Sequence, residues 1–125
     1  MPGLMKVFTY GSLQIPRIMR AVTGHRYPSE PARLDDFARY CLIGRSYQGI
    51  RRQLGAQTDG LIYLEVDTLA LQRLDAFEDD FYHRETVTVT LASGGTTLAE
   101  VYVVSPEHDH LLIMSQEWSL DHLQM

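Results

Sequence analysis

A glutamate in the second half of the chain is the first residue whose position indicates chemistry. The apolar residues of segment 69–79 occupy one arc when they are placed on a helix at about 100° per residue: Ala70, Leu71, Leu74 and Phe77. Glu78 falls inside this arc, and burial disfavours the charged form of a carboxyl and raises its pKa. The nearby Asp75, Asp79 and Asp80 act in the same direction. A carboxyl with its pKa shifted toward neutrality suits a general acid and base, so we expect Glu78 to be catalytic. The alternative is a helix that ends before Glu78 and leaves its side chain in water.

The segment Tyr10-Gly11-Ser12-Leu13 stands where a predicted strand stops and a helix soon begins. Glycine permits close approach of the backbone, and successive N–H groups at such a bend can bind an anion. A carboxylate or a developing oxyanion would suit this bend, whereas a plain strand-ending turn is the alternative. Ser12 lacks the Gly-x-Ser-x-Gly sequence of serine hydrolases, which argues against a nucleophile.

The sequence predicts neither a metal site nor a cofactor site. On a strand, His83 points away from Tyr82 and Arg84, and no second histidine lies at ligand spacing. His108 and His110 flank Asp109 in a predicted loop without a further ligand set. The single cysteine, Cys41, excludes an internal disulfide and a cysteine-rich metal site. Neither a dinucleotide-binding fingerprint nor a phosphate-binding loop occurs.

The elements that must position these residues follow from local signals. We expect strands over 5–10, 33–43, 46–50 and 61–66, the last after a turn at Asp59-Gly60. One helix spans 16–23 between Pro16 and Gly24, and a second runs from Asp67 or Thr68 to about Asp79. Residues 25–32 read as a loop, 82–91 and 98–104 as a hairpin, and 108–125 as helical pieces with Trp118 as an anchor. This pattern predicts a mostly antiparallel α+β domain that forms a small barrel.

Length and composition predict a single domain spanning residues 1–125. Hydrophobic residues make up 45% and charged residues 22%, with a net charge of −5. Residues 1–62 carry nine basic and four acidic groups, and residues 63–125 carry two and twelve, so we expect the halves to pair across the fold. This balance argues against nucleic acid binding. The chain lacks a membrane-length apolar run and a signal-peptide pattern, and with its lone cysteine we expect a cytoplasmic protein.

Several short motifs, in their order and spacing, resemble the gamma-glutamylcyclotransferase-like family, and within it the plant avirulence-induced-gene branch and its bacterial relatives. They are Val7-Phe8-Thr9-Tyr10-Gly11-Ser12-Leu13-Gln14, Gly60-Leu61-Ile62-Tyr63, Leu74-Asp75-Ala76-Phe77-Glu78, Tyr82-x-Arg84 and Val87-x-Val89. The resemblance implies a small mixed, mostly antiparallel β-barrel with flanking short helices. It also implies that the backbone amides of the Tyr10–Leu13 segment hold the substrate, that Glu78 is the acid and base, and that Tyr82 lines the pocket.

The implied reaction closes a gamma-glutamyl amine into 5-oxoproline and releases the free amine, without metal or cofactor. The implied partner is a small gamma-glutamyl substrate, with no nucleic acid and no membrane, and the protein acts as a monomer or weak homodimer. Two features depart from many relatives: Asp79 replaces a glycine, and Tyr47-Gln48-Gly49-Ile50 replaces a Tyr-Pro pair followed by Gly-Ile or Ala-Ile. The alternatives are a non-catalytic small-ligand-binding module of the same fold and an interaction domain whose main surface surrounds Trp118.

Overall fold

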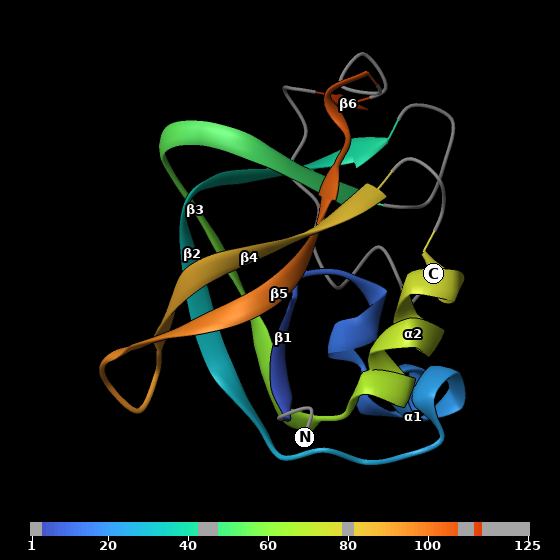
Figure 1. Cartoon of the computed structure of the whole chain (residues 1–125). Coiled ribbons are helices and arrows are strands. Elements are labelled where there is room, and N and C mark those ends of the chain that lie inside the picture. The colour runs from blue at the N-terminus through green and yellow to red at the C-terminus, as the bar shows by residue number, and fades with distance from the viewer. Residues whose placement is uncertain (1–3, 43–47, 79–81, 108–111, 114–125) are drawn as a thin grey trace.

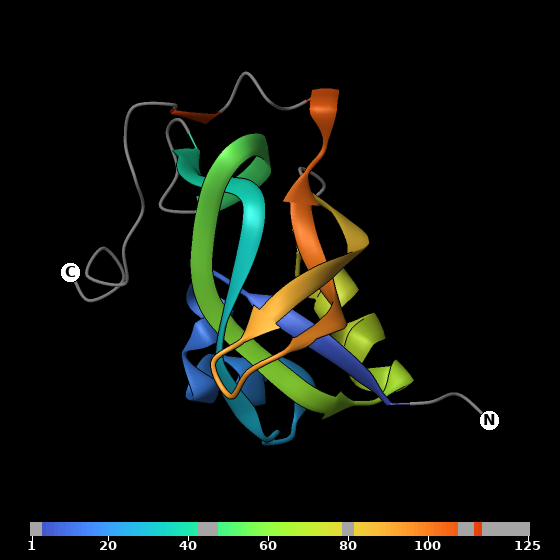
Figure 2. The ribbon, with the colours of Figure 1, turned by 90° about the vertical axis from the view of Figure 1, so that its left-hand side faces the viewer.

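Five strands close into a ring in the computed structural model, which describes residues 4–42, 48–78, 82–107 and 112–113 (Figures 1 and 2). The neighbours around the ring are β3, β1, β5, β4 and β2, and pairing of β2 with β3 closes it. The strands are β1 (Met5–Thr9), β2 (Ser29–Leu42), β3 (Gln48–Val66), β4 (Tyr82–Leu91), β5 (Thr96–Val104) and β6 (Leu112–Ile113), the last paired with β2. The helical elements are η1 (Ser12–Gln14), α1 (Pro16–Thr23) and α2 (Thr68–Phe77).

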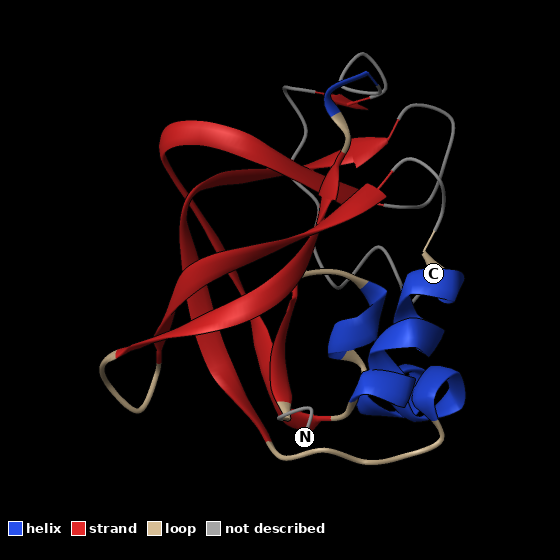
Figure 3. Cartoon of the chain, in the orientation of Figure 1, coloured by secondary structure: helices blue, strands red, loops and turns tan. Residues whose placement is uncertain are grey.

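The first strand makes the barrel mixed. β1 runs antiparallel to β3, with Val7 opposite Tyr63, and parallel to β5, with Val7 opposite Glu100. The other pairings among the described strands are antiparallel. Both helices lie together on one side of the barrel, as Figure 3 shows. The prediction of a small mixed, mostly antiparallel barrel with flanking short helices is therefore confirmed.

Alternation along β1 separates two apolar clusters. Phe8 and Tyr10 point into the barrel, where they pack with side chains from the other four ring strands. Val7 points the other way, toward the helices, and packs in a second cluster with Met19 of α1 and Leu74 of α2. Leu74 has no exposed surface, and burial of such a side chain contributes roughly 2 kcal/mol. This second cluster holds α2 against the barrel.

The predicted break at Asp59-Gly60 is wrong, because both residues lie inside the continuous strand β3. A Cβ atom at Gly60 would come within 2.1 Å of the carbonyl oxygen of Thr9 on β1. The glycine therefore permits close approach of a neighbouring strand and does not form a turn. Residues 25–32 are also not wholly a loop: β2 begins at Ser29 and continues through Pro31, whose carbonyl accepts the N–H of Ala92 at 3.0 Å.

The long β2–β3 hairpin bends where its register shifts between Asp35 and Phe37. Asp36 takes a φ of 64° and Gly55, on the partner strand, a φ of 87°. The Asp36 carboxylate accepts the backbone N–H of Gly55 at 2.9 Å, which stabilises the bend. The two long strands run side by side and curve together, as Figure 2 shows.

Other predictions meet mixed outcomes. The helix over 16–23 is confirmed, and Gly24 ends it with a φ of 87°. The second helix ends at Phe77, so its predicted extension to Asp79 is wrong, and Phe77 is half exposed. The hairpin is confirmed, although β5 begins two residues earlier, at Thr96. In the tail, Leu112–Ile113 form a strand where helical pieces were expected, and Trp118 lies outside the described residues. Within the described part of the chain, every helix is too short or too polar to cross a bilayer.

Candidate active site

Glu78 is the first residue after α2. Its backbone is extended (φ −71°, ψ 145°), and its N–H donates to the carbonyl of Leu74 at 3.0 Å. The side chain is half-buried. The predicted placement of Glu78 on the apolar face of a helix is therefore wrong, because the helix has already ended. The alternative, a Glu78 side chain that simply extends into water, is not observed either. The side chain is partly covered and interacts electrostatically with Tyr10 and Tyr102.

The hydroxyls of Tyr10 and Tyr102 lie within electrostatic range of the Glu78 carboxylate. Burial raises the pKa of Tyr10 well above its ordinary value, and the charges of Tyr82 and Glu78 raise it further. Burial also raises the pKa of Tyr102, together with a hydrogen bond to Asp75 and the negative charges of Asp75 and Glu78. The phenols thus remain neutral around the carboxylate over the whole physiological pH range.

The hydroxyls of Tyr10 and Tyr82 donate hydrogen bonds to backbone carbonyls. The hydroxyl of Tyr10 donates to the carbonyl of Tyr102 on β5 at 2.6 Å. The hydroxyl of Tyr82, the first residue of β4, donates to the carbonyl of Gln48 on β3 at 2.6 Å. Tyr10 and Tyr82 therefore position the strands around Glu78 through these bonds.

The Gly11 backbone lies directly against the side chain of Gln48. A Cβ atom at residue 11 would be 1.2 Å from the amide nitrogen Nε2 of Gln48. The guanidinium of Arg39 donates to the carbonyl of Tyr10 at 2.8 Å and to that of Asp59 at 3.1 Å, which fixes the strand end before Gly11. Sequence reasoning did not find Arg39, and it noted Gln48 only as a departure from relatives.

The predicted bend after Tyr10 is a single 3-10 turn, η1. The N–H of Gln14 donates to the carbonyl of Gly11 at 3.0 Å, whereas the amides of Ser12 and Leu13 open the turn and have no partner inside it. Leu13 is buried, and its carbonyl accepts the hydroxyl of Tyr63 at 2.7 Å. Leu13 can therefore present only its backbone to a ligand, while Ser12 is half-buried.

The structure thus brings together most of the predicted site. Tyr10 interacts electrostatically with Tyr82 and with Glu78. The Gly11 backbone lies against Gln48, whose carbonyl binds the hydroxyl of Tyr82. One expectation needs correction: Asp75 is not a free negative charge beside Glu78, because Arg84 and Tyr102 both bind its carboxylate. Asp79 and Asp80 lie outside the described residues.

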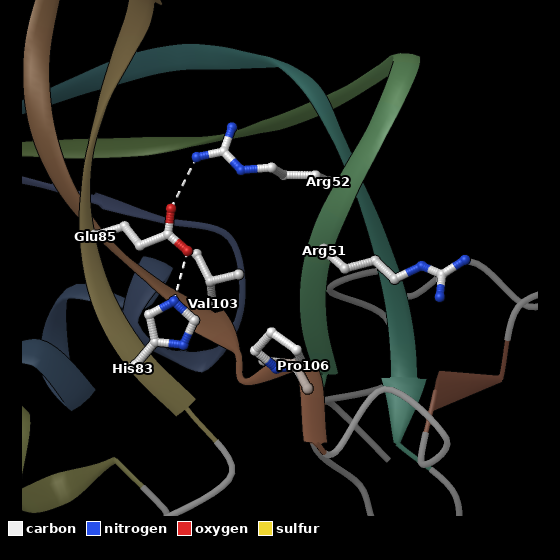
Figure 4. Close-up of a pocket in the computed structure, with 7 residues that line it drawn as sticks. Arg51, Arg52, His83, Glu85, Val103 and Pro106 are labelled. Carbon is white, nitrogen blue, oxygen red and sulfur yellow. Dashed lines mark hydrogen bonds and ion pairs between the residues drawn. The ribbon is translucent and has the colours of Figure 1, made fainter.

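A separate cavity of about 210 Å³ lies between β3 and the β4–β5 hairpin (Figure 4). Its polar groups bind one another: Glu85 accepts from Arg52 at 2.9 Å and lies 2.5 Å from Nε2 of His83. The other ring nitrogen of His83 lies 3.1 Å from the hydroxyl oxygen of Ser105. This series of serine, histidine and carboxylate has the composition of a hydrolase triad, but Ser105 is buried and does not line the cavity. These contacts therefore connect β3, β4 and the residue that follows β5, and they present no nucleophile to the cavity.

The pairing of Arg52 with Glu85 is one ion pair of the kind expected between the basic and acidic halves. Arg33 with Asp35, and Arg84 with Asp75 and Glu100, pair within one half instead. The described residues contain no group of three or more His, Cys, Asp or Glu side chains able to hold a metal ion. The His108–His110 segment and the side chain of Cys41 lie outside what the structure describes.

A small mixed barrel with helices on one side, a glycine turn after its first strand and a glutamate at the end of a helix defines a gamma-glutamylcyclotransferase-like fold. The chain belongs to the family described as "Gamma-glutamyl cyclotransferase, AIG2-like", whose family model matches residues 7–120.

Individual relatives agree. The chain is 30% identical over 123 residues to AIG2-like protein D of Arabidopsis thaliana, covering 94% of this chain and 81% of the relative. A solution structure of another Arabidopsis thaliana protein has a TM-score of 0.82 and 26% identity, with 99% of this chain and 74% of that one covered. A structure named gamma-glutamyl cyclotransferase has a TM-score of 0.71 at 17% identity, covering 88% and 76%, and shares the fold.

Proposed function

We propose that this protein cyclises a gamma-glutamyl amine to 5-oxoproline and releases the free amine, with Glu78 as general acid and base. One observation carries the proposal: Glu78 leaves α2 in an extended conformation with its carboxylate in range of the Tyr10 and Tyr102 hydroxyls, and Tyr10 leads into the Gly11 turn. Family membership supports the same class of reaction.

The chemistry is intramolecular. The substrate's α-amino nitrogen attacks its own γ-carbonyl carbon, the new C–N bond closes a five-membered lactam, and the old amide C–N bond breaks. Glu78 takes one proton from the α-ammonium, so that the free amine can attack, and the same nitrogen loses a second proton as the lactam forms. Glu78 passes both protons to the leaving nitrogen in turn, so the amine departs as an ammonium ion and no water is consumed. Because attack is within one molecule, the protein's main task is to fold the substrate into attack geometry.

The backbone amides of Gly11, Ser12 and Leu13 are the groups that we propose to hold the substrate carboxylate or the oxyanion. Tyr10 and Tyr82 would hold the walls of the site through their bonds to the Tyr102 and Gln48 carbonyls. We place this reaction in the cytoplasm, on small gamma-glutamyl substrates, in a monomer or weak homodimer that uses no metal or cofactor. The reaction as written needs none, since every proton and bond is accounted for by Glu78 and the substrate.

The test measures release of 5-oxoproline from gamma-glutamyl amino acids, Nε-(gamma-glutamyl)lysine and gamma-glutamyl alkylamines. We expect turnover by the wild type and none by Glu78→Gln, which keeps the side chain's size but cannot carry the proton. Glu107→Gln, at an exposed position after β5, is the matched control and should retain full activity. Turnover by Glu78→Gln would exclude Glu78 as the acid and base. Saturable binding of these compounds without turnover by the wild type would instead support a ligand-binding module.

A further inference from the structure

An ion pair attaches the last turn of α2 to β4. The guanidinium of Arg84 donates from Nε to Oδ1 of Asp75 at 2.9 Å and from Nη2 to Oδ2 at 3.2 Å. Two parallel bonds between a planar guanidinium and a carboxylate specify orientation as well as distance. The hydroxyl of Tyr102 donates to the same Oδ1 of Asp75 at 2.6 Å. Asp75 is therefore held from two neighbouring strands at once.

A buried carboxylate fixes the other end of Arg84. Glu100 on β5 is 6% exposed and accepts from Nη1 of Arg84 at 2.5 Å and from the hydroxyl of Thr86 at 2.5 Å. Arg84 lies opposite Tyr102 in the register of β4 and β5, and Thr86 lies opposite Glu100. The guanidinium is thus fixed between a charge on the sheet and a charge on the helix. The pKa of Arg84 is raised: burial acts against the charged form, but the bonds and charges of Asp75 and Glu100 outweigh it.

Asp75 lies on the last turn of α2, three residues before Glu78, which directly follows the helix. The main chain of this turn is also tied to Glu78, whose N–H binds the carbonyl of Leu74. The hydroxyl of Tyr102 lies in range of the charges of Asp75, Glu78 and Arg84 together. The bonds of Asp75 to Arg84 and Tyr102 therefore attach to β4 and β5 the same helix end from which Glu78 emerges.

We propose that Asp75 and Arg84 are positioning residues for Glu78: their two-bond contact sets where α2 ends over the sheet, and their opposite charges balance the electrostatic potential at the Glu78 carboxylate. The inference deepens the proposed function and rests on it for its kinetic consequences. Neither side chain acts on the reacting atoms directly, because each acts through the placement and charge environment of Glu78.

The charged and titratable groups around Glu78 come from every element packed against it. Asp75 lies on α2, Arg84 and Tyr82 on β4, and Tyr102 and Glu100 on β5, where Glu100 binds Arg84. Tyr10 follows β1, and Arg39 of β2 binds the Tyr10 carbonyl. The phenols are neutral at physiological pH, since burial raises the pKa of Tyr10 and Tyr102. Removal of the Asp75 charge therefore takes one negative charge away from the surroundings of Glu78, while Arg84 keeps its bond to Glu100.

Two variants separate charge from geometry. Asp75→Asn keeps the shape and removes the negative charge, whereas Arg84→Lys keeps the positive charge and removes the planar fork. We expect both to lower kcat on the best substrate of the panel by about 10- to 100-fold with little change in KM, because displacement of a catalytic group mainly affects the transition state. The matched control is Asp35→Asn, which breaks the exposed Arg33–Asp35 pair (3.1 Å) on β2 and should leave kcat unchanged.

The second measurement does not depend on turnover. The side-chain carboxyl ¹³C shift of Glu78, assigned by its loss in Glu78→Gln, is followed against pH in each variant. Asp75→Asn removes a negative charge near Glu78, which favours the ionised carboxylate, so the titration midpoint of Glu78 should fall by roughly half a pH unit. It should stay within about 0.2 units in Arg84→Lys and Asp35→Asn, where the charge near Glu78 is kept.

The outcomes are distinct. If the wild type releases no 5-oxoproline from any substrate, the proposed function fails, and the titration still decides the electrostatic inference. Wild-type kcat and an unchanged Glu78 midpoint in Asp75→Asn, even with a lowered Tm, would show that the pair only stabilises the fold and would overturn the inference. A lowered midpoint in Asp75→Asn with the control unchanged supports it.

Discussion

The side-chain amide of Gln48 occupies the space that any side chain at residue 11 would need, with its Nε2 atom 1.2 Å from the position of a Cβ on Gly11. The backbone carbonyl of Gln48 also accepts a hydrogen bond from the hydroxyl of Tyr82. One residue at the start of β3 thus contacts the glycine turn with its side chain and the first residue of β4 with its main chain. Gln48 therefore connects the glycine turn at Gly11 with Tyr82 at the start of β4.

Replacement of Gly11 by alanine tests this contact. The obstructing atoms belong to the flexible end of a side chain, so Gln48 can rotate away and we expect a loss in the free energy of unfolding of only about 1 kcal/mol. The displaced amide and turn should lower kcat/KM for 5-oxoproline release by about tenfold or more. Urea unfolding and steady-state kinetics measure the two effects. In Gly11→Ala/Gln48→Ala the stability should recover while the activity does not; recovery of activity would contradict the assigned role of Gln48.

Gly60→Ala should be much more damaging than Gly11→Ala, although the substitution is the same. At residue 60 a Cβ would lie 2.1 Å from the backbone oxygen of Thr9 and 2.8 Å from the ring of Phe8. A strand backbone cannot rotate away, so β1 must shift from β3, and we expect about 3 kcal/mol or more of lost stability. Urea unfolding of both variants under one condition makes the comparison. Equal losses would show that β1 and β3 are not as closely packed as described.

Alkaline pH should destabilise the protein in a defined window. Burial raises the pKa of Tyr63 from 10.0 to about 12, and its hydroxyl donates to the carbonyl of Leu13. The unfolded chain releases this proton near pH 10 and the folded chain near pH 12. The stabilising contribution of protonated Tyr63 to the free energy of unfolding is therefore complete below pH 10 and is lost as the pH rises through about 12.

Unfolding midpoints in urea between pH 9 and pH 12 measure this loss. Burial also raises the pKa of Tyr10 and Tyr102, so the wild type should retain some decline beyond the part due to Tyr63. Tyr63→Phe keeps the ring and should show a shallower decline than the wild type over the same range. Identical slopes for the two proteins would mean that folding does not raise the pKa of Tyr63.

Elements with strong local signals could be predicted from sequence. Pro16 presets the first turn of α1, and Gly24 adopts the left-handed conformation that ends it, so both bounds were found. Asp59-Gly60 carries an equally strong turn signal, but here the glycine is required by Thr9, a residue some fifty positions away. A prediction from neighbouring residues cannot include this requirement, because Thr9 comes next to Gly60 only when β1 pairs with β3 in the folded barrel.

Some residues of the candidate site could likewise be predicted from the sequence, and others could not. Periodicity and family resemblance pointed to Glu78, yet its helical placement was wrong because α2 stops at Phe77, which is half exposed. Gln48, Arg39 and Tyr102 reach the site from three different strands, and no spacing in the sequence relates them to Glu78. The motif residues Asp75 and Arg84 were visible, but their pairing depends on how α2 lies on β4.

The parallel pairing of β1 with β5 has a consequence for synthesis on the ribosome. The strand that leads into the Gly11 turn is made first, but its ring partners are the C-terminal half of β3 and β5, with Val7 opposite Tyr63 and Glu100. A nascent chain therefore cannot seat β1 between both partners until β5 has emerged from the exit tunnel. Until then β1 has at most one neighbour, and its other edge is open to any chaperone that recognises an unpaired strand.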